Sequence, residues 1–415
     1  MTRLVVLGGS GVATPELLAA IRGIGGRSVP IEVVLVGRDA EKLACVAGVA
    51  RLLAEDDPLL TVGYSTDAAA ALEGADFVLN QVRVGGMKAR AFDESFSQEL
   101  GLAGEETVGP GGFANASRTI PVALEYACLI ERVAPEALLL TFANPASLVQ
   151  YAITRYTQVR VIGLCDAPVT LGEAVARAVE VPAAELSIDY AGMHHFGWVT
   201  GAWRRGVDLL PRALARAGEI HKDIEPAIIQ AMGAIPSSYL EYVFHPDRML
   251  AKSRGKRTRA EELLDLQGEM LADFEQALQR REKPASLARR GARWYSAIIA
   301  PVLVSLAEGR AGRARVARYI LNVTNGQTVP WLPADAVVEV PVLVDGGRVQ
   351  PLATGPVPAA VRALVQANCA YEMAAVQAIV ERDRAKALQA LLLSPIACTY
   401  DQAVAVLDKA WQQGS

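Results

Sequence analysis

The feature that most constrains the fold is an alternation of short apolar runs and amphipathic segments through the first 165 residues. The apolar runs, rich in Val, Ile and Leu, lie at residues 4–7, 31–36, 76–79, 137–142 and 159–164. Amphipathic segments such as 40–54 and 120–133 separate them. Apolar strands that alternate with helices form parallel sheets covered on both faces. We therefore predict an α/β fold whose residues 1–165 form a Rossmann-type, doubly wound parallel sheet that binds a dinucleotide.

Beyond residue 165 the pattern changes to a mixture of apolar runs and longer helical segments. Strands are predicted at 186–193, 196–202, 316–323 and 337–344, and helical segments at 208–230, 259–281 and 358–407. We predict that residues 166–415 form an α+β domain for substrate binding, metal binding and oligomerisation. The apolar stretch 388–393 suggests a subunit interface, although core packing explains it equally well. We expect a homodimer or homotetramer.

Composition excludes several classes of function. Asp and Glu (45) slightly outnumber Lys and Arg (41), which gives a net charge of -4 and argues against the basic face of a nucleic-acid binder. No apolar run is long enough to cross a bilayer. The five cysteines are odd in number and widely spaced, as is typical of reduced thiols. We expect a cytoplasmic enzyme that acts on a small molecule and binds neither nucleic acid nor membrane.

A glycine-rich turn follows the first predicted strand and precedes a helix that opens near Thr14 and Pro15. Glycines allow the backbone to approach a pyrophosphate, and the helix N-terminus supplies amide donors. In this βαβ context the turn predicts a nicotinamide dinucleotide. The predicted cofactor-binding residues are Gly8, Gly9, Ser10, Gly11, Arg38 and Asn80.

The end of the second predicted strand leaves the form of the dinucleotide open. An acid that grips the adenosine ribose is expected there, but Gly37 occupies the position. Arg38 suits a 2′-phosphate; the alternative is a solvated loop charge, with Asp39 capping the next helix. The residues therefore allow NAD or NADP.

Three polar segments lie where a parallel sheet would open its cleft and are candidates for the rest of the site: 80–86, 104–112 and 144–145. We interpret Gly109-Pro110-Gly111-Gly112 as a loop that exposes backbone amides to an anion or a closely approaching ligand. Arg83 suits a phosphate or carboxylate because its planar guanidinium binds such groups bidentately. The alternative for Arg83 is a structural ion pair.

Taken together, these motifs resemble glycoside hydrolase family 4, the NAD- and metal-dependent glycosidases, and most closely its 6-phospho-β-glucosidase branch. The resemblance covers nearly the whole chain. Besides the segments above, it rests on Gly163-Leu164-Cys165-Asp166-Ala167-Pro168, Gly192-Met193-His194-His195-Phe196-Gly197-Trp198, Ile235-Pro236-Ser237-Ser238-Tyr239-Leu240, Trp294-Tyr295-Ser296 and Asp335-Ala336-Val337-Val338-Glu339-Val340-Pro341.

The resemblance implies a metal site and a pair of catalytic residues. Cys165 and His195 fall on the pair that holds the divalent metal, usually Mn²⁺. Tyr239 falls on the base, and Asp166 is placed to protonate the leaving oxygen. The alternative for Asp166 is a residue that orients the metal site, and a Tyr in this apolar segment is otherwise typical of a core.

The resemblance also implies the substrate contacts and the reaction. Asn144 and His194 would contact the sugar, and Arg83 and Arg290 its 6-phosphate. NAD would remove hydride from C3, a base would take the C2 proton, and the leaving group would be eliminated. Water would then add and hydride would return to C3.

Four departures from the family keep other functions open. Gly37 lacks the acid, Glu105 stands where Gln is usual, His194 replaces Asn, and Asp166 is typical of 6-phospho-α-glucosidases. The alternatives within the family are a 6-phospho-α-glucosidase or an enzyme for unphosphorylated glycosides. The rival from another class is an NAD-dependent 2-hydroxy-acid dehydrogenase, which would accumulate reduced nicotinamide.

Overall fold

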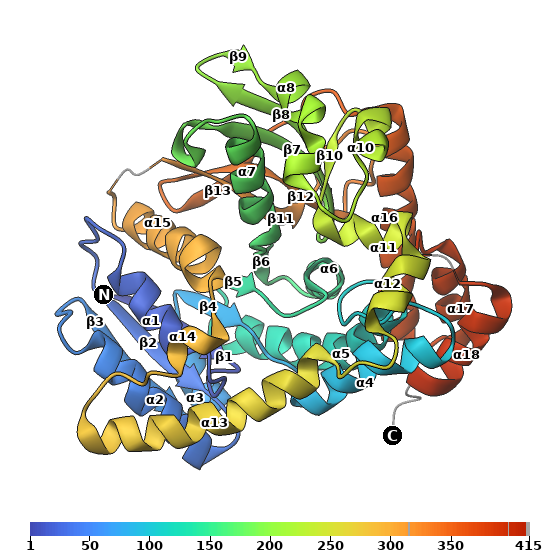
Figure 1. Cartoon of the computed structure of the whole chain (residues 1–415). Helices are drawn as coiled ribbons and strands as arrows, with labels where there is room; N and C mark the ends of the chain where they lie inside the picture. The colour runs from blue at the N-terminus through green and yellow to red at the C-terminus, as the bar shows by residue number, and fades with distance from the viewer. Residues whose placement is uncertain (314–315, 397, 412–415) are drawn as a thin grey trace.

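The computed structural model describes residues 1–313, 316–396 and 398–411. Its N-terminal half is a parallel sheet in the order β3-β2-β1-β4-β5-β6 (Figure 1). The strands are β1 (Thr2–Leu7), β2 (Ile31–Val36), β3 (Leu60–Ser65), β4 (Phe77–Asn80), β5 (Leu138–Thr141) and β6 (Arg160–Gly163). This order confirms the predicted doubly wound fold. The sequence did not predict β3, which is half exposed at the edge of the sheet and lacks a continuous apolar run.

The helices of this half connect the parallel strands: α1 (Pro15–Arg22), α2 (Ala40–Ala54), α3 (Ala68–Leu72), α4 (Gly86–Glu99), α5 (Gly109–Val133), α6 (Ala146–Tyr156) and α7 (Ala167–Ala178). The predicted helix 120–133 begins eleven residues earlier, at Gly109, so the predicted loop at 109–112 is wrong. A Cβ on Gly111 would lie 1.9 Å from the carbonyl oxygen of Glu105. The glycines therefore allow α5 to pack against the preceding segment.

The sheet continues past β6 into the second half of the chain. β11 (Ala317–Thr324) pairs antiparallel with β6, and β12 (Val337–Asp345), β7 (Ser187–Met193), β8 (Phe196–Arg204) and β10 (Ile235–Pro236) follow in that order. β9 (Val207–Asp208) pairs with β8, and β13 (Arg348–Pro351) with β12. The predicted strands of this half are all present. A boundary at residue 165 stays a prediction, since one sheet runs across that position.

Two long helical predictions are wrong in their continuity. Residues 208–230 contain α8 (Leu210–Ala215), α9 (Ala217–Ile220) and α10 (Pro226–Met232), and Pro226 restarts the helix at its first turn. Residues 358–407 contain α16 (Ala359–Glu381), α17 (Arg384–Leu393) and α18 (Tyr400–Ala410), separated first at Arg382, which has a φ of +56°. The remaining helices are α11 (Glu241–Phe244), α12 (Pro246–Ser253), α13 (Arg259–Arg280), α14 (Leu287–Arg290), α15 (Ala300–Arg310), the π-helix Tyr295–Ile299 and the 3-10 helices Ala183–Glu185 and Ser238–Leu240.

Successive residues of β1 point to opposite apolar layers, which shows that both faces of the sheet are covered. Leu4 and Val6 belong to the layer that includes α1, α2, α13 and α15, whereas Val5 and Leu7 belong to the layer that includes α5, α6 and α16–α18. Helix α13 runs along the lower edge in Figure 1 and packs against α2 and α4. A parallel sheet buried on both faces leaves its strand ends as the place for ligands.

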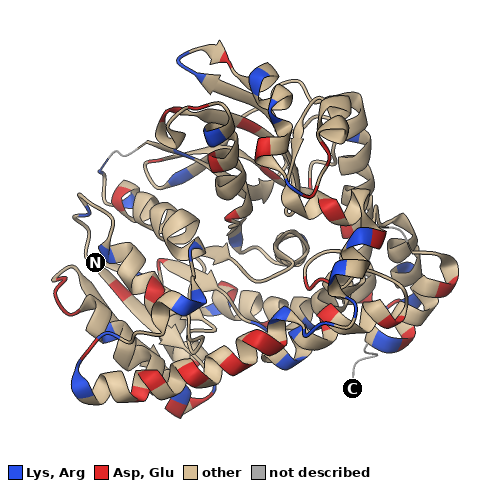
Figure 2. Ribbon diagram, in the orientation of Figure 1, with Lys and Arg blue, Asp and Glu red and all other residues tan. Residues whose placement is uncertain are grey.

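Charge is spread over the molecule, as the near-neutral composition predicts. Figure 2 shows basic and acidic residues interspersed on the elements of both halves. Among the described residues, no helix has the length and apolar character required to span a membrane.

Candidate active site

A cleft opens where β1, β2, β4 and β5 end. The order of the sheet reverses between β1 and β4, which is the point at which doubly wound folds bind ligands. Its volume, about 320 Å³, lies in the range of small-molecule sites. Four cations (Arg38, Lys42, Arg83, Arg290) and no carboxylate line it among the described residues. The cleft therefore suits a ligand that carries several negative charges.

The glycine-rich turn forms the floor of one end of this cleft. Gly8 has a φ of +82°, and a Cβ on it would lie 2.9 Å from the carbonyl oxygen of Gln81. Gly9 packs against β2, where a Cβ would lie 2.8 Å from that of Leu35. Only glycine fits either position, so the turn keeps its backbone open to the cleft. This is the cradle that a dinucleotide pyrophosphate requires.

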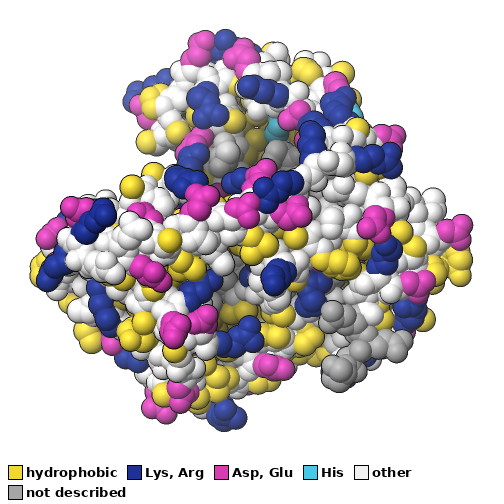
Figure 3. All heavy atoms as spheres, turned by 60° about the horizontal axis from the view of Figure 1, so that its bottom comes forward, with side chains coloured by type: hydrophobic (Ala, Val, Ile, Leu, Met, Phe, Trp, Pro, Cys, Tyr) yellow, Lys and Arg dark blue, Asp and Glu magenta, His cyan; other side chains and the backbone are white. Residues whose placement is uncertain are grey.

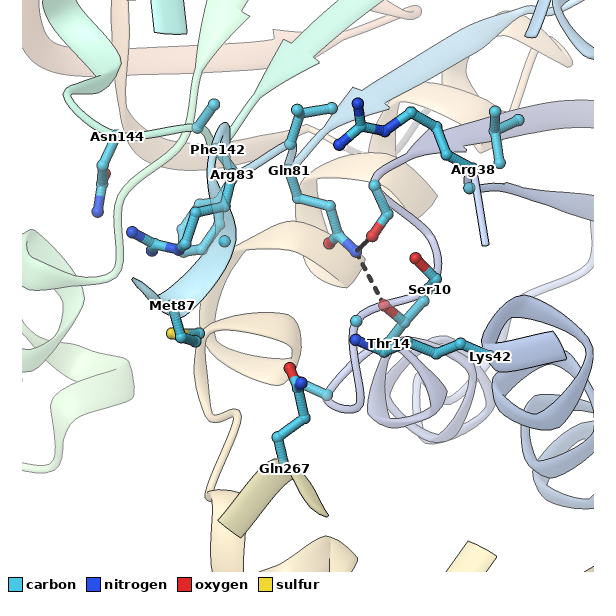
Figure 4. A pocket seen from close by; sticks show the side chains of 18 of the residues that line it. Ser10, Thr14, Arg38, Lys42, Gln81, Arg83, Met87, Phe142, Asn144 and Gln267 are labelled. Atoms are coloured by element: carbon cyan, nitrogen blue, oxygen red, sulfur yellow. Dashed lines mark hydrogen bonds between the residues drawn. The ribbon is translucent and has the colours of Figure 1, made fainter. Parts of the chain in front are cut away.

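Gln81 ties this turn to the second half of the chain. Its Nε2 donates to the Thr14 hydroxyl (2.9 Å), and its Oε1 accepts a bond from the Tyr295 hydroxyl (2.7 Å). Figure 4 shows Gln81 between Ser10 and Thr14 on one side and Arg83 and Asn144 on the other. The sequence placed Gln81 and Tyr295 in motifs but gave them no role.

The structure brings most, but not all, of the predicted cofactor residues to the cleft. Gly8, Ser10, Gly11 and Arg38 line it. Asn80 is buried: its Nδ2 lies 3.4 Å from the Thr141 hydroxyl, and its Oδ1 accepts from the backbone of Val82. The cofactor role of Asn80 stays a prediction, and its neighbour Gln81 lines the cleft instead.

Two predicted phosphate ligands differ in their partners. Arg83 lines the cleft and also forms the ion pair with Glu106 that the sequence allowed as an alternative. Arg290 lies over the Trp294 ring, 4.7 Å from its centroid, and forms no ion pair with a carboxylate among the described residues. Burial and the neighbouring guanidinium groups, Arg90 first, lower the pKa of Arg290. Arg290 is thus a cleft cation whose charge is not neutralised by an ion pair with a carboxylate of the described residues.

A thiol and two imidazoles meet beyond the end of β6. Cys165 follows that strand, and His194 and His195 form the two-residue turn between β7 and β8. Their candidate ligand atoms all lie within 4.8 Å of one another. The structure thus brings together Cys165 and His195, and it adds His194, which the sequence assigned to the sugar. His195 has a φ of +60°, a conformation uncommon for a side chain this size and found often at functional sites.

The electrostatics of this cluster suit a metal ion. Burial lowers the pKa of His194 to about 3 and holds that of His195 well below its ordinary value, so both rings are neutral with free lone pairs. The buried Nδ1 of His195 has no hydrogen-bond partner among the described residues. Burial and nearby Glu339 raise the pKa of Cys165, and a bound cation would reverse this and favour the thiolate. The residues therefore fit a divalent metal.

The two predicted catalytic residues adjoin this cluster. Tyr239 follows β10, and its ring stacks on that of His195 with a centroid distance of 3.5 Å and an angle of 9°. Burial, followed by the charge of Glu105, raises the pKa of Tyr239 well above its ordinary value. Asp166 stands directly before α7, and burial raises its pKa as well. The phenol acts as a base only if positive charge is supplied beside it.

The glycine-rich turn and the cluster share one edge of the sheet. Leu7, Asn80, Thr141 and Gly163 form one row across β1, β4, β5 and β6. Three strand spacings of about 4.8 Å put the ends of this row about 14 Å apart. Figure 3 shows a hollow in the surface bordered by basic and acidic side chains.

Fold and cleft together define a dinucleotide-binding α/β enzyme, and comparisons with known proteins give its family. The profile described as "Family 4 glycosyl hydrolase" matches residues 3–181, and that of the family's C-terminal domain matches 190–397. The chain belongs to glycosyl hydrolase family 4, as the resemblance implied.

The relatives within the family are named for activity on either the α- or the β-anomer. The chain is 31% identical to the probable 6-phospho-beta-glucosidase of Bacillus subtilis, over 98% of this chain and 95% of the relative. It is 29% identical to the phospho-alpha-glucosidase PagL of Clostridium acetobutylicum, over 97% and 96%. The solved 6-phospho-beta glucosidase of Thermotoga maritima with NAD and glucose-6-phosphate superposes with a TM-score of 0.88 at 27% identity, over 99% and 97%.

Proposed function

We propose that the protein is a 6-phospho-β-glucosidase that works through transient oxidation of the sugar. The observation that carries this proposal is the position of Arg290 in the same cleft as the glycine-rich turn, where it forms no ion pair with a carboxylate of the described residues. Arg290 and Arg83 would bind the 6-phosphate, for which a guanidinium is well shaped. Solved relatives named for NAD, manganese and glucose-6-phosphate support this assignment.

The chain's own residues then have separate tasks. Cys165 and His195 would hold a divalent ion, Mn²⁺ by comparison with relatives, and Asn144 would hydrogen-bond the sugar hydroxyls. When bound, the nicotinamide supplies reversible oxidation at C3, and the metal supplies Lewis acidity beside C2 and C3.

Proton transfer is assigned to two residues next to the cluster. Tyr239 would take the C2 proton, because its ring lies against that of His195, and a cation held by His195 would supply the positive charge that a phenolate requires. Asp166 would give a proton to the leaving oxygen, and burial raises its pKa, which favours the protonated form. His194 lies in the same cluster and would contact the sugar.

The proposal extends to the setting of the enzyme. All five cysteines are free in the structure, which is consistent with a reducing cytoplasm. Leu392 and Leu393, at the end of α17, are 48% and 42% exposed, and they suit a contact between subunits of a homodimer or homotetramer. Size-exclusion chromatography with light scattering tests this part.

The test is hydrolysis of nitrophenyl 6-phospho-β- and 6-phospho-α-glucosides and their unphosphorylated forms, with Mn²⁺ and either nicotinamide cofactor. We expect turnover of the 6-phospho-β-glucoside, deuterium from solvent at C2 of the product, and no accumulation of reduced nicotinamide. Preference for the α-anomer would change the proposed activity to that of a 6-phospho-α-glucosidase. Asp166 and the similarity to PagL would then explain this preference. Stoichiometric nicotinamide reduction without hydrolysis would indicate a dehydrogenase and refute the proposal.

A further inference from the structure

The end of β2 has no room for the acid that selects NAD. In doubly wound folds an Asp or Glu at this position accepts hydrogen bonds from the adenosine ribose. Here the residue is Gly37, and a Cβ on it would lie 2.9 Å from the Ser10 hydroxyl oxygen and 3.2 Å from Leu43 Cδ1. A carboxylate side chain at residue 37 is therefore excluded unless Ser10 moves.

Two cations lie next to this position instead. Arg38 follows Gly37 and is exposed, and Lys42 lies in the first turn of α2 and is half-buried. Both line the cleft together with Ser10 and Thr66. Neither forms an ion pair with a carboxylate among the described residues. In the view of Figure 4, Ser10 lies between Arg38 and Lys42.

The nearest acid is already engaged. Asp39 caps α2, with its Oδ1 accepting from the backbone amide of Lys42 at 3.1 Å. The carboxylate is thus directed at the helix N-terminus and leaves the two cations without a bonded partner. Burial lowers the pKa of Lys42, as expected of an amine that lacks a bound anion.

We propose that Arg38, Lys42 and Ser10 bind the 2′-phosphate of NADP, and that this chain uses NADP in preference to NAD. A guanidinium can bind two phosphate oxygens, an ammonium adds a second charge, and a hydroxyl adds a donor. The 2′-phosphate is remote from the nicotinamide, so the redox chemistry of the proposed function is unchanged. The inference rests on that function only in taking the cleft as a dinucleotide site.

The alternative is that Arg38 stacks on the adenine ring, as guanidinium groups do on flat ring systems. In that case Arg38 would help NAD and NADP equally, and Lys42 would not discriminate between them. The two possibilities differ in what the 2′-phosphate contributes, and a binding measurement separates them without any turnover.

The experiment is isothermal titration calorimetry of the full-length protein with NADP⁺ and NAD⁺, in the presence of Mn²⁺ and without sugar. We expect NADP⁺ to bind at least about tenfold more tightly than NAD⁺, since hydrogen bonds between charged groups have that effect or more. Adenosine 2′,5′-bisphosphate should likewise bind more tightly than 5′-AMP, which isolates the adenosine half of the cofactor. Its advantage should shrink as salt is raised.

Variants assign the effect to the two side chains. Arg38→Ala and Lys42→Ala should each weaken NADP⁺ binding about tenfold and leave NAD⁺ binding nearly unchanged. Arg51→Ala is the matched control, because Arg51 is an exposed arginine in the last turn of the same helix and does not line the cleft. It should change neither affinity.

The outcomes distinguish this inference from the proposed function. If NAD⁺ binds as tightly as NADP⁺ or more tightly, the preference is refuted and the glycosidase proposal stands. Equal losses of both dinucleotides in Arg38→Ala also refute it, in favour of stacking on adenine. If neither dinucleotide binds, the inference and the proposed function both fail.

Discussion

The two ends of the active-site region are built in opposite ways. At the nucleotide end, the glycine-rich turn, Arg38 and Lys42 all come from the first 42 residues, and no carboxylate lines the cleft among the described residues. At the proposed sugar end, Cys165, His195 and Tyr239 come from three separate segments. The first end depends on backbone shape and positive charge, and the second depends on how distant parts of the chain pack.

The two ends also differ in their buried acids. Burial raises the pKa of Glu105 to about 7 and those of Glu339 and Glu372 to about 8. The Glu339 carboxylate accepts from the Tyr190 hydroxyl and from Asn322, and its charge acts on Cys165. Buried acids therefore lie near the proposed sugar end, and a bound divalent cation would favour their ionised forms. The nucleotide end, in contrast, carries positive charge that favours binding of an anion.

The largest effect is expected from Cys165→Ser, which should weaken Mn²⁺ binding at least about 100-fold, since loss of outer-shell partners alone costs 10- to 100-fold. Glycosidase activity should fall with it. Calorimetry measures the metal affinity. Cys369→Ser is the control, because Cys369 is equally buried (1% against 2% exposed) but lies on α16. Dinucleotide affinity should persist in both variants. Unchanged Mn²⁺ binding in Cys165→Ser would show that Cys165 is not a ligand of the metal.

Tyr239→Phe should lower turnover by about 10²- to 10⁴-fold, the range for loss of a general base, with a small effect on KM. Exchange of the sugar C2 proton with solvent should fall by the same factor, as followed by NMR in deuterium oxide. Tyr242→Phe serves as the control, since Tyr242 is a half-buried tyrosine three residues away. Normal turnover in Tyr239→Phe would mean that another group takes the proton.

Arg290→Gln should raise KM for the 6-phosphorylated glucoside by about 10- to 100-fold, because this is the loss of affinity expected when one charge-assisted hydrogen bond is removed. Turnover of an unphosphorylated glucoside should be unaffected. Arg289→Gln is the neighbouring control, because Arg289 is exposed and paired with Glu269. A loss of dinucleotide affinity in Arg290→Gln, with no change in KM for the sugar, would assign Arg290 to the nucleotide end instead.

The smallest effect concerns stability and pH at the back of the sugar end. Burial raises the pKa of Glu372 from 4.5 to about 8 in the folded chain. The unfolded chain releases this proton first as pH rises, so folding stability should fall between about pH 5 and about pH 8. Glu372→Gln should flatten this fall. The drop in Tm between about pH 5 and about pH 8 should be a few degrees smaller in the variant than in the wild type.

The control for this measurement is Glu381→Gln, on the same helix. Glu381 is exposed, and a hydrogen bond from Lys386 lowers its pKa from 4.5, so it is ionised in the folded and the unfolded chain above about pH 5. Glu381→Gln should therefore leave the change of stability between about pH 5 and about pH 8 as it is in the wild type. Identical slopes in wild type and Glu372→Gln would show that the folded chain does not hold this proton.

The sequence predicted what depends on local pattern. The strands other than β3 and the short β9, β10 and β13, the turn at Gly8 and the cap at Asp39 follow from runs of residues that are contiguous in the chain. The assignment of Cys165 and His195 to one metal site depended on the family resemblance, because β11 and β12, which come from much later in the chain, lie between β6 and β7 in the sheet. The helical start of α5 was missed because its glycines serve contacts with residues outside the segment.

Side-chain partners could not be predicted for the same reason. Nothing adjacent in the sequence indicates that Arg83 pairs with Glu106 while Arg290 lacks such a partner. The inward turn of Asn80 and the contact of Gln81 with Tyr295 likewise depend on elements more than 60 and more than 200 residues away. Only the tertiary structure shows which polar groups of a motif remain available to a ligand.

The sheet that runs from β6 into β11 limits how the enzyme can exchange its ligands. A hinge between the halves would have to separate hydrogen-bonded strands, and it would also break the bond from Tyr295 to Gln81 above the glycine-rich turn. We therefore expect sugars to enter and leave through the existing opening of the cleft, without a movement of the two halves. The dinucleotide should stay bound over many turnovers. That behaviour suits a cofactor that is regenerated in every cycle and never needs replacement.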